Sequence, residues 1–255
     1  MDYLKKIFGL TGKAALVTGG GRGIGQVVAV GLANAGAAVA IFSRTGADET
    51  VRLIEASGGK AISIIADVTD EAAVDAGISK ILDRFGSLDI VFNNAGVCIH
   101  KDSFESSIAE WREVVDINLT GEYIVARAAG RVMRDRGIRG SIINMASMSG
   151  VVVNVPQWQA SYNSSKAAII HMSRSLAVEW APYGIRVNSV SPGYIATPMS
   201  VDTPQELRDA WLPLIPQERM GDPEELIPPI LYLASPAAGY TTGSDVTVDG
   251  GYSAR

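Results

Sequence analysis

Tyr162 and Lys166 are the residues of this sequence whose chemistry and spacing first point to a reaction. They lie near the start of a stretch, 161–180, whose apolar residues recur at helical spacing, and residues four apart share one face of a helix. A phenol titrates at about pH 10, so acid–base chemistry near neutral pH needs its pKa lowered by about 3 units. A neighbouring cation lowers the pKa because it favours the phenolate. The pair therefore predicts an acid–base centre, although an ordinary helix start with a surface lysine has the same spacing.

A glycine-rich segment, Thr18–Gly25, follows the short apolar run 14–17. Apolar residues at helical spacing come directly after it, which predicts a buried strand, a turn and a helix start in that order. Backbone N–H groups at such a helix start can face an anion, and glycines let the backbone approach a pyrophosphate closely. The segment predicts a dinucleotide phosphate site, although a glycine-rich turn without a ligand has the same composition.

The end of the second predicted strand, 38–42, bears on which dinucleotide would bind. In dinucleotide-binding folds an acidic residue here holds the ribose 2′-hydroxyl, whereas a nearby arginine accommodates a 2′-phosphate. Ser43 and Arg44 stand where the acid would be, and Arg22 could approach the same phosphate. Each arginine alone is explained by a solvated surface. Together with the missing acid they favour NADP(H), with NAD(H) as the alternative.

Predicted strands and helices alternate along the whole chain. This pattern is typical of an α/β domain with a doubly wound parallel sheet, right-handed crossovers and helices on both faces. No repeat or linker interrupts it, so we expect a single domain over 1–255. The predicted strands are 14–17, 38–42, 61–66, 88–92, 141–145, 185–190 and 245–248, and the main predicted helices are 47–56, 71–85, 106–115, 119–136, 161–180 and 223–234.

Polar residues follow several of these strands, and ligands of open α/β sheets bind beyond the carboxyl ends of the strands. Asp67 and Val68 follow the third strand, Asn93–Gly96 the fourth, and Ser147 the fifth. Asp67 could accept a hydrogen bond from an adenine amino group or simply cap the next turn. The Asn93–Gly96 segment could steady the central crevice of the sheet. Asn118, between two predicted helices, could hold a water or kink the helix.

Two segments are candidates for enclosing a substrate. The segment 151–159 lies between Ser147 and Tyr162 and resembles a loop that rims a site. Prolines break the segment from about 194 to 222 into an irregular flap that carries Trp211, and a long irregular insertion is often an active-site lid.

Composition excludes several classes of function. The net charge of −5 gives no electrostatic case for nucleic-acid binding. The single cysteine, Cys98, rules out an internal disulfide and suits a reducing compartment. His100 and His171 have no carboxylate cluster around them, so we expect no metal site. No signal peptide or membrane span is evident, and the expected location is the cytoplasm.

Taken in order, the glycine-rich segment, Asn93–Gly96, Ser147 and the Tyr162–Lys166 spacing resemble the motifs of the short-chain dehydrogenase/reductase family over nearly the whole chain. The resemblance implies a Rossmann-like fold and hydride transfer with a dinucleotide cofactor. Tyr162 would give or take the substrate hydroxyl proton, and Lys166 would lower the pKa of that phenol and bind the nicotinamide ribose. Ser147 would orient the carbonyl. The residues that would line the cofactor are Gly19, Arg22, Gly23, Ile24, Gly25, Ser43, Arg44, Asp67, Val68, Asn94, Ala95, Gly96, Tyr162, Lys166, Pro192, Gly193, Ile195 and Thr197.

The same resemblance gives Asn118 the role of supporting a water-linked proton relay. Within the family, segments such as Ala146–Gly150 and Asp249–Tyr252 resemble the polyol dehydrogenase and ketose reductase branch, which includes mannitol, galactitol and sorbose enzymes. In that branch the residues that match Ser149 and Asn154 reach substrate hydroxyls, and they would bind substrate together with Ser147 and Tyr162. Alternatively, Ser149 and Asn154 only order their loop.

The sequence therefore predicts an NADP(H)-dependent oxidoreductase that interconverts a ketose or small ketone with its polyol or secondary alcohol. One alternative is a 3-oxoacyl-(acyl carrier protein) reductase, because the arginines within 131–139 could dock an acidic carrier. Another is a non-catalytic dinucleotide-binding regulator, which would not need the set of Ser147, Tyr162 and Lys166. Some members of the family assemble through their long helices, so the resemblance also implies a homotetramer.

Overall fold

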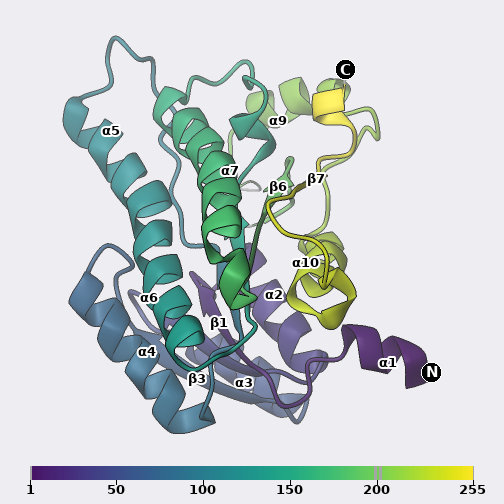
Figure 1. Cartoon of the computed structure of the whole chain (residues 1–255). Coiled ribbons are helices and arrows are strands. Elements are labelled where there is room, and N and C mark those ends of the chain that lie inside the picture. Colours follow the sequence, from purple (N-terminus) through teal and green to yellow (C-terminus); the bar gives the residue numbers. More distant parts are fainter. Residues whose placement is uncertain (1, 198–199, 201–202, 255) are drawn as a thin grey trace.

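One sheet of seven parallel strands forms the centre of the molecule, and helices cover both of its faces (Figure 1). The computed structural model describes residues 2–197, 200 and 203–254. The strand order is β3-β2-β1-β4-β5-β6-β7. Strands β2 and β3 lie on one side of β1 and strands β4 to β7 on the other, so the strand order reverses between β1 and β4. The strands are β1 (Ala14–Thr18), β2 (Ala38–Ser43), β3 (Lys60–Ile65), β4 (Ile90–Asn93), β5 (Ser141–Met145), β6 (Arg186–Pro192) and β7 (Asp245–Val248).

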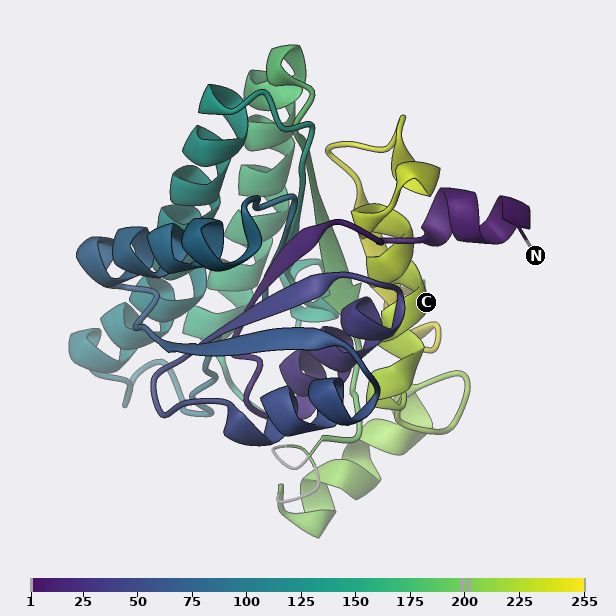
Figure 2. The ribbon, with the colours of Figure 1, turned by 90° about the horizontal axis from the view of Figure 1, so that it is seen from below.

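Two groups of helices pack on opposite faces of this sheet (Figures 1 and 2). One face carries α2 (Gly23–Asn34), α3 (Asp48–Ala56) and α10 (Ile227–Ala234). The other carries α4 (Glu71–Phe85), α6 (Gly121–Asp135) and α7 (Ala160–Trp180). The remaining α-helices of the described chain are α1 (Asp2–Phe8), α5 (Ile108–Val115) and α9 (Gln205–Trp211). Figure 2 shows α1 at the edge of the molecule, beside the last part of the chain.

The core lies on both faces of the sheet, because strands such as β1 and β2 carry apolar residues on both sides. All five residues of β1 are buried, as a parallel strand covered on both faces requires. Successive residues point to opposite faces, so Leu16 packs with the α4 and α6 cluster while Val17 packs with the α2 and α10 cluster. The predicted α/β architecture with a doubly wound parallel sheet is confirmed.

Local signals fixed some helix boundaries closely. The predicted helix 71–85 begins after Asp70, whose carboxylate accepts hydrogen bonds from Ala72 and Ala73 N–H, and ends at Gly86 in the left-handed region (φ 78°). The sequence predicted two helical stretches, 106–115 and 119–136, that meet at Asn118. A π-helical turn, Asp116–Thr120, connects α5 and α6 without a break.

The segment predicted as an irregular flap, about 194–222, contains the short helix α9 and is therefore only partly irregular. Residues 198, 199, 201 and 202 of this flap lie outside the described residues. The predicted helix 223–234 is shorter in the structure, because a 3₁₀ turn, Pro223–Leu226, precedes α10. Pro228 and Pro229 occupy the first turn of α10, where a missing N–H costs no hydrogen bond.

Candidate active site

The glycine-rich segment lies at the point where the strand order reverses, between β1 and β4. The Thr18 hydroxyl at the end of β1 accepts hydrogen bonds from the Asn94 and Ala95 N–H groups at 2.9 and 3.0 Å. In return the Asn94 side-chain amide donates to the carbonyls of Thr18 (3.0 Å) and Gly19 (3.3 Å). Asn94 and Ala95 thus fasten the glycine-rich segment to the end of β4.

The glycines of this segment are needed for its backbone geometry. Gly19 and Gly23 adopt positive φ angles of 65° and 56°, which side chains rarely allow. A Cβ on Gly25 would lie 2.5 Å from the Asn94 Nδ2 and from the Gly19 carbonyl oxygen. The bare backbone at the start of α2, with Ile24 beside it, fits a pyrophosphate group. The residues present therefore fit a dinucleotide at this end of the site.

The residues predicted at the adenosine ribose also lie beside this segment. A Cβ on Gly21 would be 3.5 Å from the Ser43 Oγ, so Ser43 faces the glycine-rich segment, and Arg22 and Arg44 are exposed around it. Asp67 accepts hydrogen bonds from Thr69 N–H (2.9 Å) and its hydroxyl (2.7 Å). These two bonds, and then the charge of Arg44, lower the pKa of Asp67. Asp67 caps the turn before α4 here, as its alternative interpretation proposed.

The residues predicted at the nicotinamide end follow β6. Gly193 N–H donates to the Val248 carbonyl at 2.9 Å, and a Cβ on Gly193 would lie 2.7 Å from the Asp249 Cα. Ile195 pairs with Gly221 in a single bridge. A Cβ on Gly23 would be 3.9 Å from the Thr197 Cβ. The segment after β6 and the start of α2 therefore face one another across the end of the sheet.

Ser147, Tyr162 and Lys166 come together beyond the carboxyl end of β5. The Ser147 hydroxyl lies close enough to the Tyr162 phenol to lower its pKa, and it accepts a hydrogen bond from Ser149 N–H at 3.1 Å. The Lys166 ammonium is buried, donates to the Met145 carbonyl at 2.5 Å and lies 5.6 Å from the centroid of the Tyr162 ring. These three residues form the constellation that the sequence predicts for acid–base chemistry on a carbonyl or alcohol.

Burial has a larger effect on the pKa of the Tyr162 phenol than any neighbouring charge. Burial raises the pKa of Tyr162, with a smaller increase from the nearby Cys98 and a decrease from the Ser147 hydrogen bond. Burial likewise lowers the pKa of Lys166. The argument from helical spacing considered the cation and left out desolvation, which has the largest effect on the pKa of this phenol here.

Asn118 holds the loop after β4 against α7. Its side-chain oxygen accepts from Val97 N–H at 2.8 Å, and its amide donates to the Val97 carbonyl at 2.9 Å and the Ser165 hydroxyl at 3.1 Å. The side chain is fully buried in the π-helical turn. Its hydrogen bonds make it a brace between the loop and the start of α7, and Gly96 lies against it.

Ser149 and Asn154, the residues predicted to bind substrate, belong to a buried polar network with Gln159 at its centre. The Gln159 amide donates to Ser149 Oγ (3.3 Å), Asn154 Oδ1 (3.2 Å) and Asn163 Oδ1 (2.9 Å). Asn154 in turn donates to the Tyr194 hydroxyl at 3.3 Å. Both candidate residues therefore order their loop, and their contact with substrate stays a prediction.

A second arm of the network reaches the flap. Gln157 donates to the same Tyr194 hydroxyl at 2.9 Å, and the Trp211 indole N–H donates to Gln157 Oε1 at 2.9 Å. The Trp211 ring stacks on Tyr194 with 4.2 Å between centroids. The flap is thus fixed to the loop 151–159 by hydrogen bonds of Asn154 and Gln157, and the stacked rings join two parts of the flap itself.

Several of these residues were missed as site residues by sequence reasoning. Thr18, Gln157, Gln159 and Tyr194 are common residue types whose roles depend on partners far along the chain. Glu122 was missed as well, although a carboxylate four positions after Asn118 on a helix with an apolar face was a usable signal.

The arrangement defines a class of protein: an α/β dinucleotide-binding fold with a serine, a tyrosine and a lysine at the end of one strand. No group of three or more His, Cys, Asp or Glu residues that could hold a metal occurs within residues 2–197, 200 and 203–254. No helix in that part of the chain combines the length and apolar character needed to cross a membrane.

Comparisons with known proteins identify the family. A family model described as enoyl-(acyl carrier protein) reductase matches residues 19–253. The chain is 44% identical over 253 residues to a probable NADP-dependent mannitol dehydrogenase of Yarrowia lipolytica, covering 96% of this chain and 89% of that protein. It is 41% identical over 254 residues to the galactitol 2-dehydrogenase (L-tagatose-forming) of Cereibacter sphaeroides, with 99% of both covered.

Solved structures agree. A short-chain type dehydrogenase/reductase from Mycobacterium marinum superposes with a TM-score of 0.95 at 43% identity, covering 98% of this chain and 99% of that one. A putative 2-deoxy-D-gluconate 3-dehydrogenase from Agrobacterium tumefaciens with bound NADP gives a TM-score of 0.89 at 36% identity, covering 97% and 99%. The chain belongs to the short-chain dehydrogenase/reductase family, and its relatives are oxidoreductases that act on alcohol groups.

Proposed function

We propose that this protein is an NADP(H)-dependent oxidoreductase that interconverts a ketose and the corresponding polyol. The observation that carries the proposal is the position of the Ser149, Asn154 and Gln159 network beside Ser147 and Tyr162. A sugar alcohol needs several polar partners, and sites that hydrogen-bond hydroxyls reject substrates that lack them. Relatives named for mannitol and galactitol support this substrate class.

The preference for NADP(H) rests on the second strand. Ser43 stands at the position where an acidic residue would repel a 2′-phosphate. Arg22 and Arg44 are exposed near Ser43. The mannitol relative is named NADP-dependent, and the 2-deoxy-D-gluconate structure contains NADP.

In this mechanism the bound cofactor supplies the hydride for reduction and accepts it in oxidation. Tyr162 donates its phenol proton to the carbonyl oxygen during reduction and removes the hydroxyl proton during oxidation. The Ser147 hydroxyl orients the same oxygen. Lys166 would hold the nicotinamide ribose, and its positive charge would favour the phenolate. Asn118 keeps the loop 96–98 in place and supports the relay through which the proton leaves.

A panel of carbonyl substrates tests this function. NADPH and NADH oxidation would be followed with fructose, sorbose, xylulose, tagatose and a 3-oxoacyl thioester. We expect turnover of at least one ketose with NADPH preferred. Turnover of the thioester alone would show the alternative, a 3-oxoacyl-(acyl carrier protein) reductase, and a clear preference for NADH would contradict the argument from Ser43 and Arg44.

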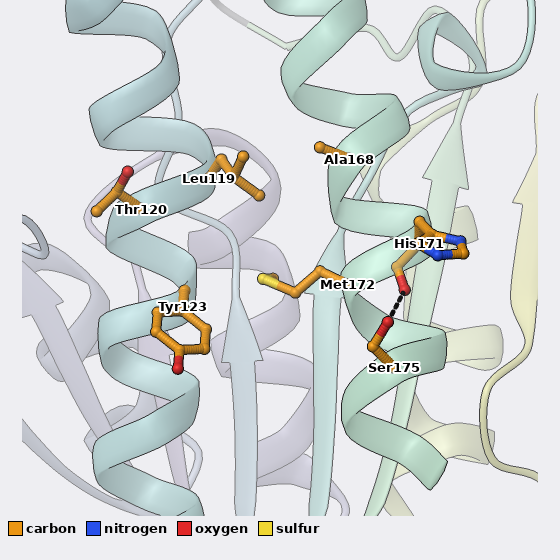
Figure 3. A pocket seen from close by; sticks show the side chains of 7 residues that line it. All are labelled: Leu119, Thr120, Tyr123, Ala168, His171, Met172 and Ser175. Atoms are coloured by element: carbon orange, nitrogen blue, oxygen red, sulfur yellow. Dashed lines mark hydrogen bonds between the residues drawn. The ribbon is translucent and has the colours of Figure 1, made fainter. Parts of the chain in front are cut away.

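We also propose that the protein is a homotetramer in which a second copy packs on α6 and α7. A shallow groove of about 430 Å³ lies between these helices, lined mainly by apolar atoms, and Figure 3 shows Met172 pointing into it between Tyr123 and His171. Sedimentation equilibrium would give the mass of the assembly, and a monomer would contradict this assembly.

A further inference from the structure

Glu122 is a buried carboxyl that the proposed mechanism does not use. It lies on α6, one turn after Asn118, with 2% of its surface exposed. Residues four apart share a helix face, and this face looks onto α7: Asn118 bonds Ser165, and Glu122 faces Lys166. The two helices lie side by side in Figures 1 and 3.

The contacts of Glu122 are unusual for an interior carboxyl. Its Oε1 lies 3.7 Å from the Lys166 Nζ, which is an ion-pair distance but too long for a hydrogen bond. Neither carboxyl oxygen has a hydrogen-bond partner among the described residues, and the same is true of the side-chain oxygen of Asn93. The Asn93 amide donates instead to the Glu122 backbone carbonyl at 3.2 Å.

Such a carboxyl is a poor way to stabilise a fold. Removing a charge from water is unfavourable, and an interior ion pair offsets this only with good geometry and additional hydrogen bonds. Glu122 has neither, so an apolar side chain would serve the packing better. Its position against the catalytic lysine, in contrast, gives its charge a direct effect on the reaction site.

The electrostatics follow from that position. Burial raises the pKa of Glu122 to about 8, with Lys166 opposing the increase. A charged Glu122 in turn raises the pKa of the Tyr162 phenol. The titratable groups that face this cluster are Lys166 and Tyr162 on α7 and Cys98 in the loop after β4.

We propose that Glu122 is a positioning residue that holds the Lys166 ammonium and, through its own charge, limits how strongly that ammonium favours the Tyr162 phenolate. The proposal rests on the proposed function of Tyr162 and Lys166. When Glu122 is protonated, the lysine acts on the phenol with its full charge. When Glu122 is ionised, the pair is neutral and the phenol keeps its proton to higher pH.

Glu122→Gln tests this in the active enzyme, because glutamine keeps the shape of the protonated acid and cannot ionise. The pH dependence of kcat/KM for alcohol oxidation would be measured with whichever alcohol is turned over. We expect its midpoint to move to lower pH by about one unit relative to the wild type. Glu113→Gln, on the exposed side of α5, is the matched control and should leave the midpoint unchanged. An unmoved midpoint, or one moved to higher pH, would overturn the proposal.

A measurement on the cofactor-free protein separates this inference from the substrate assignment. Glutamate carboxyls labelled with ¹³C would be titrated by NMR in the wild type and in Lys166→Met. One glutamate should titrate near pH 8, and its midpoint should rise by about one unit or more when the lysine charge is removed. If no glutamate midpoint changes, Glu122 and Lys166 are not coupled and the proposal fails. Since neither cofactor nor substrate is present, failure of the ketose assay leaves this result unaffected.

Discussion

Replacing Asn118 with alanine should lower both the stability of the protein and its rate. The substitution removes three buried hydrogen bonds, of 2.8, 2.9 and 3.1 Å, which join the π-helical turn to Val97 and Ser165. At about 1 kcal/mol for each bond, the free energy of unfolding should fall by about 3 kcal/mol. The freed loop lies beside Lys166, because a Cβ on Gly96 would be 3.8 Å from its Nζ. A shift of about 1 Å there should reduce kcat by about 100-fold.

Urea unfolding followed by circular dichroism, together with steady-state kinetics, would measure both effects. Ser165→Ala provides the comparison, because it removes one of the three Asn118 bonds and the Ser165 hydrogen bond to the Tyr162 carbonyl. The double variant should be less destabilised than the sum of the two single variants by about 1 kcal/mol, since they share one bond. A loss below about 1 kcal/mol for Asn118→Ala, with full turnover kept, would refute its role as a brace.

Two further substitutions test the ends of the site. Ser43→Asp should lower kcat/KM for NADPH by at least about 10-fold and improve NADH use, because a carboxylate repels a 2′-phosphate. The neutral Ser43→Asn variant is the control. Equal kinetics of the two variants would contradict the placement of Ser43 at the 2′-phosphate. Trp211→Phe keeps the ring against Tyr194 but loses the 2.9 Å bond to Gln157, so the KM for the ketose should rise by about fivefold with the KM for NADPH unchanged. A change confined to the cofactor KM would show that the flap does not serve the substrate.

The sequence was sufficient for features that depend on neighbours along the chain. An apolar run of five residues, 38–42, marked the buried strand β2, and Gly86 marked the end of α4. The glycine-rich segment could be placed because a strand, a turn and a helix start occur there in a row. In the same way, four-residue spacing placed Tyr162 and Lys166 on one helix.

Features that depend on distant partners could not be predicted in this way. The hydrogen bonds of Gln157 and Gln159 to Tyr194, Ser149 and Asn154 join a loop, a helix start and the flap. The pKa of Tyr162 depends on how deeply the phenol is buried, which spacing does not reveal. The π-helical turn at Asn118 also leaves no sign in the order of apolar residues.

The central claim is that Tyr162 is the acid–base group of an NADP(H)-dependent carbonyl reduction. Tyr162→Phe removes only the hydroxyl, so it tests that claim most directly when turnover and NADPH binding are measured on the same preparation. We predict that kcat falls by at least about 100-fold while the Kd for NADPH, from fluorescence titration, changes by less than about threefold. A variant that still turns over at a rate near that of the wild type would contradict the account.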